Sequence, residues 1–139
     1  MKLVYIRKHG LIYTVGANPK VQYQLLEALL EHIDFEFNEM YDVKVILSYG
    51  NFSPGLFNRF KPKIQNIIWN FANLDLVKRI HIECRVCGKV LPLFVKKSFI
   101  ENAESYPVPI VYSHKGHAVL CFIDKNFHHR GVELVNITG

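Results

Sequence analysis

The sequence has no long hydrophobic run. Hydrophobic residues make up 50% of its 139 residues, yet no stretch reaches the roughly 18 uninterrupted apolar residues that a membrane-spanning helix needs. The opening segment, Met1 to Arg7, becomes charged before an apolar run can develop, so the pattern of a secretory signal is missing. We therefore expect a globular protein without a membrane span, located in the cytoplasm.

Familiar catalytic motifs are also missing. Gly50 and Gly55 lack the neighbouring Lys-Ser/Thr of a phosphate-binding loop. The sequence contains neither a Gly-x-Ser-x-Gly elbow nor a His-Glu-x-x-His pair. These absences favour a protein that is not an enzyme of a familiar class, and they leave novel chemistry open.

No run of basic residues is dense, although the formal net charge is +5 and the isoelectric point is about 9.1. The cations are spread in pairs such as Lys61 with Lys63 and Lys96 with Lys97. A nucleic-acid footprint usually gathers its Lys and Arg in one patch. A solvated basic surface is the favoured interpretation, and an anionic partner such as nucleic acid is the alternative.

Cysteine is scarce, at three residues, which argues against a disulfide-stapled secreted scaffold. In a reducing compartment, closely spaced cysteines are more often metal ligands or redox groups than staples. Cys84 and Cys87 are closely spaced, and they are the first candidates for chemistry.

The first half of the chain predicts the order strand, strand, helix, strand, helix. A turn at His9-Gly10 separates two apolar segments, and Asn18-Pro19 is a typical helix start. The long helix that follows repeats apolar residues every three or four positions. The predicted elements are strands at 3–6, 11–15 and 43–49 and helices at 19–40 and about 62–72.

The second half is predicted to be rich in strands. Pro92 makes its strand an edge or bends it. The predicted elements are strands at 79–83, 90–95, 110–112, 117–124 and 132–135 and one helical turn at 98–105. The chain is therefore predicted to be a mixed α/β (α+β) protein. Its halves, 1–75 and 76–139, are expected to form one compact unit because neither alone offers a comfortable core.

The strongest motif is Cys84-x-x-Cys87-Gly88, which has the form of a zinc knuckle. Two thiolates at this spacing can bind one tetrahedral ion, and glycine after the second cysteine allows the chain to turn. His114 and His117 are the nearest candidates to complete the site. Four protein ligands would make the ion structural rather than catalytic. A pair of ordinary thiols and a redox pair are the alternatives, and the histidines could simply be solvated.

Other candidate residues compete with this site. Cys121 is a competing ligand, but its distance from His117 along a strand favours a core thiol. His128 and His129, near Asp124, could form an open catalytic site, but adjacent side chains on an extended chain face opposite ways. A polar turn is the favoured interpretation of that segment.

An aromatic-rich segment precedes the second predicted helix. It contains Phe52, Leu56, Phe57 and Phe60. These side chains either tuck under that helix or form an exposed docking patch for a protein partner.

Residues 2–50 resemble longin or SNARE-like (roadblock-type) domains. The resemblance lies in KLVYIRKHGLIY, from Lys2 to Tyr13, and in the long helix through Asn38-Glu39-Met40-Tyr41. It implies a non-enzymatic adaptor that binds small GTPases and trafficking partners. After Tyr49 the order of elements departs from that fold, which expects further strands before its next helix.

The second half is similar to uncharacterised, archaeal proteins with a zinc-ribbon-like end. The similarity rests on Cys84-x-x-Cys87-Gly88, the segment from Pro109 to Tyr112, His114 with His117 to Leu120, and the segments 123–126 and 130–133. It implies a structural zinc ion and supplies no activity.

The predicted function is a protein-interaction (adaptor) module with a structural zinc site at Cys84, Cys87, His114 and His117. A sheet edge or the segment from Phe52 to Phe60 would meet a protein partner such as a small GTPase. One alternative is a zinc-ribbon nucleic-acid-binding or transcription-associated protein. Another is a metal-dependent enzyme using His114, His117, Asp124 and His128. The oligomeric state is open, with a homodimer as one option.

Overall fold

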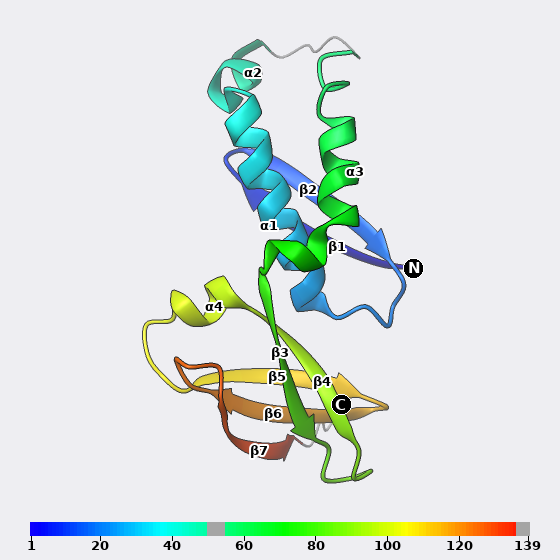
Figure 1. Cartoon of the computed structure of the whole chain (residues 1–139), viewed down its shortest axis with the longest axis vertical. Coiled ribbons are helices and arrows are strands. Elements are labelled where there is room, and N and C mark those ends of the chain that lie inside the picture. Colours follow the sequence, from blue (N-terminus) through cyan, green and yellow to red (C-terminus); the bar gives the residue numbers. More distant parts are fainter. Residues whose placement is uncertain (50–54, 136–139) are drawn as a thin grey trace. The chain divides into compact units, whose positions relative to one another are not determined.

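The computed structural model describes residues 1–49 and 55–135, and the chain divides into two units, Met1–Leu76 and Val77–Gly139. Within the described residues the fold is mixed α+β, with seven strands in three small antiparallel sheets and four α-helices (Figure 1). None of the described helices is long and apolar enough to cross a membrane.

The first unit opens with the predicted hairpin. Strand β1 (Lys2–Lys8) pairs with β2 (Leu11–Ala17) in an unbroken antiparallel register. The turn residues His9 and Gly10 have φ values of 54° and 79°, as a two-residue type I′ turn requires. A side chain at position 10 would also come within 2.8 Å of Leu47, so glycine suits both the backbone and the space.

Helix α1 (Tyr23–Met40) confirms the predicted long helix, but it begins later than the predicted start at residue 19. Gln22, not Asn18, is the residue before the first turn. The Asn18 side chain instead accepts a hydrogen bond from the Lys20 N–H at 2.9 Å, and the Asn18 carbonyl accepts one from Val21. Asparagine readily forms such local turns, so the helix begins one turn later than the sequence indicated.

The strand predicted over 43–49 is wrong, because α2 (Val43–Tyr49) is a helix there. The Asp42 carboxylate accepts hydrogen bonds from the backbone N–H groups of Lys44 and Val45, which is the work of a helix N-cap. Val43 and Ile46, three positions apart, are buried. Capping and one buried helical face outweigh the weak strand preference of β-branched residues.

Helix α3 (Lys61–Trp69) carries Pro62 in its first turn and is followed by a short 3-10 helix, η1 (Phe71–Leu74). Two apolar clusters surround α1. One lies against the hairpin and comprises Val4, Leu26 and Leu30. The other lies toward α2 and α3 and comprises Ile33, Phe37, Val43, Ile46, Phe60 and Ile67.

The second unit consists of two sheets and one short helix. Strands β3 (Val77–Glu83) and β4 (Val90–Lys96) form a hairpin, and α4 (Lys97–Glu101) follows. Strands β5 (Val108–His114), β6 (His117–Ile123) and β7 (His129–Val135) form the second sheet in that order. The strands predicted in this half are confirmed, and the helical turn predicted over 98–105 is confirmed as far as Glu101.

A single apolar core lies in the second unit. Alternate residues of β3 and β4, such as Ile82 and Leu93, join Ile110, Val119 and Ile123 from the other sheet. Ile100 of α4 is fully buried in the same core. This core fixes the ends of both sheets, where the candidate site lies.

Candidate metal centre

A loop between β3 and β4 presents the two cysteines. The Cys84 N–H donates to the Lys89 carbonyl at 2.9 Å, and the Gly88 N–H donates to the Cys84 carbonyl at 2.7 Å. Gly88 has φ +70°, and a side chain there would meet nothing within 4 Å. Glycine is therefore needed for the backbone conformation and not for space.

A tight hairpin presents the two histidines. His114 ends β5, His117 begins β6, and the two are direct cross-strand partners. Lys115 and Gly116 between them both have positive φ, at 46° and 77°. A two-residue turn of this kind places its flanking residues opposite each other on one face of the sheet. The histidine ring centroids are accordingly 6.5 Å apart.

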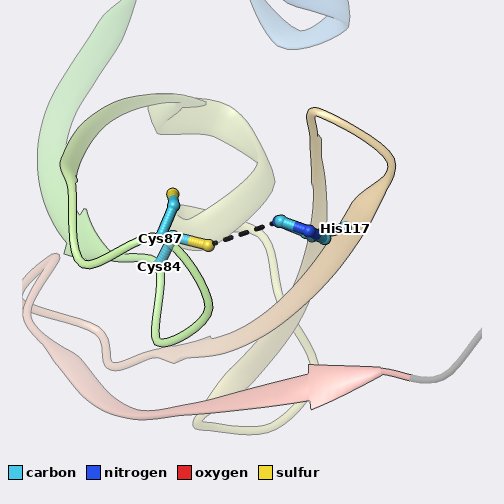
Figure 2. Close-up of side chains that lie close together, drawn as sticks. All are labelled: Cys84, Cys87 and His117. Atoms are coloured by element: carbon cyan, nitrogen blue, oxygen red, sulfur yellow. Dashed lines mark hydrogen bonds between the residues drawn. The ribbon is translucent and has the colours of Figure 1, made fainter.

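The loop and the hairpin bring sulfur and nitrogen atoms together. Ligand atoms of Cys84, Cys87 and His117 all lie within 4.8 Å of one another. The Cys84 Sγ lies 3.8 Å from His117 Nδ1 (Figure 2). His114 is outside that group of three, but its Nε2 lies 3.4 Å from the Cys87 Sγ. The cysteine and histidine pairs, separated by 26 residues in the sequence, thus meet in space.

These distances suit a tetrahedral zinc ion. With Zn–S of about 2.3 Å and Zn–N of about 2.0–2.1 Å, sulfur and nitrogen ligands of one ion lie about 3.6 Å apart. The two S···N distances, 3.8 and 3.4 Å, fall on either side of that value. A metal ion could therefore be accommodated with small side-chain adjustments.

The electrostatics favour the ligand forms of these groups. The backbone N–H of Cys87, and then those of Val86 and the neighbouring side chains, lower the pKa of Cys84 to about 7 against the opposing effect of burial. Desolvation, followed by the nearby cations Lys115 and Lys89, lowers the pKa of His114. Thiolate and neutral imidazole are the forms that bind metal.

Cys121 is not part of this site. Its side chain is fully buried in the apolar core of the second unit. Burial raises the pKa of its thiol to about 11. It is a core thiol, as the sequence favoured.

Asp124 and His128 lie at the other end of β6 from His117, in the turn before β7. The Asp124 carboxylate accepts hydrogen bonds from the backbone N–H groups of Asn126 and His128 and from the Arg130 side chain. These hydrogen bonds stabilise the turn between β6 and β7. The open catalytic site that would combine His114, His117, Asp124 and His128 is not assembled.

The aromatic-rich segment is only partly exposed. Phe60 is 5% exposed and packs edge-on against Phe37 of α1. The Phe57 ring is tilted against the ring of Phe37 and meets the ring of Tyr41 edge-on. Leu56 is 38% exposed, and Phe52 lies outside the described residues. The docking patch is corrected at Phe60, because burial against α1 removes that side chain from any surface.

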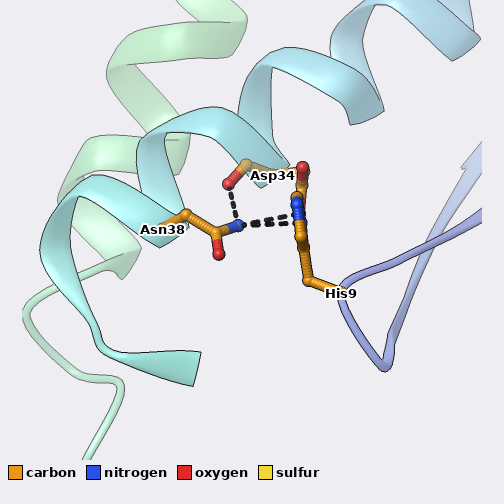
Figure 3. Close-up of polar contacts among 3 residues, drawn as sticks. All are labelled: His9, Asp34 and Asn38. Atoms are coloured by element: carbon orange, nitrogen blue, oxygen red, sulfur yellow. Dashed lines mark hydrogen bonds and ion pairs between the residues drawn. The ribbon is translucent and has the colours of Figure 1, made fainter. Parts of the chain in front are cut away.

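A second polar cluster, which the sequence did not indicate, lies in the first unit. Asp34 is 5% exposed on α1. It accepts hydrogen bonds from Asn38 Nδ2 at 2.9 Å and from His9 Nδ1 at 3.2 Å (Figure 3). Burial, and then the nearby Asp34 carboxylate, raises the pKa of Tyr13 well above its usual value. The cluster fastens the hairpin turn to the helix.

Comparisons with protein-family models, with curated proteins and with solved structures find no match to this chain.

Proposed function

We propose that this protein is a non-enzymatic interaction module whose second unit is held together by a structural zinc ion. Cys84, Cys87, His114 and His117 would bind the ion. The observation that carries the proposal is the convergence of the ligand atoms of Cys84, Cys87 and His117 within 4.8 Å. His114, 3.4 Å from Cys87, supplies the fourth ligand.

A structural role fits the place of the site. The cysteines belong to the loop that joins β3 to β4, whereas the histidines close the hairpin between β5 and β6. An ion bound by both would fasten the two sheets of this unit at one end. Cys84 is fully buried, and a four-ligand site has no open position for substrate. Zinc would then supply folding free energy rather than chemistry.

Zinc content and stability test this proposal together. We expect the purified chain to carry one zinc ion per molecule, and expect Cys84→Ser and His117→Ala to lose it with a lower unfolding temperature. His81→Ala is the matched control, because His81 is an exposed histidine of β3. It should keep both zinc and stability. Stoichiometric zinc in both site variants would show that the ligand assignment is wrong.

His114→Ala separates a closed site from an open one. If His114 is a ligand, its loss should weaken zinc binding by more than about 10-fold, because even the loss of a hydrogen-bond partner of a ligand typically costs about that much. Unchanged zinc affinity would leave three ligands and an open fourth position, which favours catalysis. Thiol titration of the zinc-free protein checks the redox alternative, since a redox pair would be recovered as a disulfide.

The adaptor part of the proposal rests on the first unit. Within the residues that the structure describes, the Cys84, Cys87 and His117 group is the one His/Cys/Asp/Glu group close enough to hold a metal, and the first unit contributes nothing to it. The β1–β2 hairpin of the first unit carries the exposed side chains of Leu3, Tyr5 and Ile12. A small GTPase, the partner class implied by the longin-like resemblance, is the first to try in a pull-down with purified protein.

Nucleic-acid binding is the second candidate function, and one observation favours it. Lys89 and Lys115 are exposed beside the metal site, close enough for Lys89 to lower the pKa of Lys115. Together with Arg85 they give the knuckle three cations. A gel shift with generic DNA and RNA at low salt tests this, because phosphate contacts weaken steeply as salt rises. Absence of binding at low salt eliminates this function.

A further inference from the structure

Strand β2 has an open edge without the usual protection. The two-stranded sheet contains β1 and β2 alone. Among the described residues, no backbone hydrogen bond outside the hairpin involves residues 11–17. Natural proteins protect such edges with charges, proline or bulges. The sequence of β2, LIYTVGA, has no charge and no proline, and its register with β1 is unbroken.

The hairpin geometry decides which backbone groups face the open edge. Lys8 and Leu11 flank the two-residue turn and are cross-strand partners, so they form a hydrogen-bonded pair. Such pairs alternate along an antiparallel ladder with pairs whose backbone groups point away from each other. Ile12, Thr14 and Gly16 therefore direct their N–H and C=O groups to the open edge of β2.

The side chains at this edge are apolar or small and accessible. Ile12 is 62% exposed, and Thr14 is exposed beside Tyr5 on the same outer face. The opposite face of the hairpin packs on α1 through Val4, which is 3% exposed. The edge can therefore accept another strand without disturbing the buried face.

We propose that a second copy of this chain pairs its β2 antiparallel to this β2, centred on Thr14. Thr14 would face Thr14 of the second copy, and Ile12 would face Gly16 of the second copy. Each of these pairs would be hydrogen-bonded, because all three residues direct their backbone groups outward. The sulfur of Met1 already lies over Gly16, so Ile12 of the second copy would gain an apolar neighbour.

Charge favours the edge of β2 over the edge of β1 for such pairing. Two copies that each carry a net charge of +5 repel each other over most of their surface. The same antiparallel operation on β1 would place Lys2 opposite Lys8 of the second copy, and like charges in such positions are unfavourable. Two β2 strands bring no charges together. One strand satisfies both sides of a two-fold interface, as a symmetric dimer requires.

Sedimentation equilibrium of the full zinc-containing chain tests the proposal. Pairing of one strand edge buries little surface, so we expect a weak dimer whose population rises with concentration. Thr14→Lys places two like charges at the two-fold axis and should raise the dimer Kd about tenfold or more. Tyr5→Lys is the matched control: it adds the same charge to the same face at the cross-strand position on β1, and should leave the Kd within about twofold.

Hydrogen exchange gives a second readout that needs no variant. The amides of Ile12, Thr14 and Gly16 should become protected as the protein concentration rises, whereas those of Leu3, Tyr5 and Arg7 should not. A chain that stays monomeric at all concentrations overturns the proposal. So does a dimer that Tyr5→Lys breaks and Thr14→Lys spares, or one that both variants break, because these would point to face-to-face stacking. Zinc content is measured on each variant, so that loss of the second unit is recognised separately.

Discussion

The two units differ in how their apolar cores are organised. In the second unit, twelve of the described residues are buried in one continuous cluster, and they come from both sheets, from α4 and, at Cys84, from the knuckle loop. In the first unit, α1 separates two smaller clusters, and a buried carboxylate, Asp34, lies on the helix that both clusters share. Among the described residues, the largest fully buried side chains, which include Ile82, Ile100 and Ile123, all belong to the second unit.

This difference shows where each unit is vulnerable. Units of this size bury a smaller fraction of their surface on folding than larger domains do, and they often need an added constraint. The second unit has a candidate metal centre that joins its two sheets. The first has a hydrogen-bonded cluster that joins its hairpin turn to α1. We therefore expect metal removal to affect one unit and loss of Asp34 to affect the other.

Removal of metal should have the largest effect. We expect a strong chelator to unfold the second unit and leave the first folded, because the ligands belong to the second unit alone. Segment-resolved hydrogen exchange, measured with and without chelator, should show faster exchange over 77–135 and unchanged exchange over 1–49. Equal loss of protection in both units would show that they fold as one body. Unchanged exchange in both units would show that zinc does not stabilise the second unit.

Ile82→Ala should be the most damaging single substitution in the apolar core. Ile82 is 1% exposed, and its truncation leaves a cavity that costs about 2–5 kcal/mol of unfolding free energy. Denaturant titration of the zinc-containing protein measures the loss. Val90→Ala is the control, since Val90 is 64% exposed on the neighbouring strand and its truncation should cost less than about 0.5 kcal/mol. Similar losses in both variants would contradict a single well-packed core.

Asp34→Ala should destabilise the first unit by about 1–3 kcal/mol, because Asn38 and His9 would lose a buried acceptor. Glu39→Ala, an exposed acidic residue of the same helix, is the control and should change stability little. The amides of the hairpin turn should exchange faster in Asp34→Ala alone. Unchanged exchange there would mean that the turn is held by apolar contacts instead.

The smallest expected effect is on acid stability. The backbone N–H of His128, and then Asn126 and Arg130, lower the pKa of Asp124. A carboxylate whose folded pKa is depressed contributes stability above its unfolded pKa of about 3.9 and loses it as pH falls through the folded value. Asp124→Asn should therefore flatten the decline in unfolding temperature of the second unit below about pH 4. A decline as steep as in the parent chain would exclude Asp124 as its source.

Several features were predictable because they depend on neighbouring residues. The turn at His9-Gly10, the helix ending near Met40 and the strands around the knuckle all follow from local patterns, and the structure confirms them. The β-branched residues at 43–49 predict a strand, whereas the capping hydrogen bonds of Asp42 make the segment a helix. The two-residue turn at Lys115-Gly116 indicates that the side chains of His114 and His117 lie on the same face of the hairpin.

By itself, the sequence determined which residues could bind a metal and which loops would carry them, since thiols, imidazoles and glycine turns act locally. Tertiary structure decided that Cys84 and Cys87 meet His117 and that Phe60 packs inward. It also placed Asp34, His9 and Asn38 together. These outcomes depend on how distant segments pack, and no local pattern of residues carries that information.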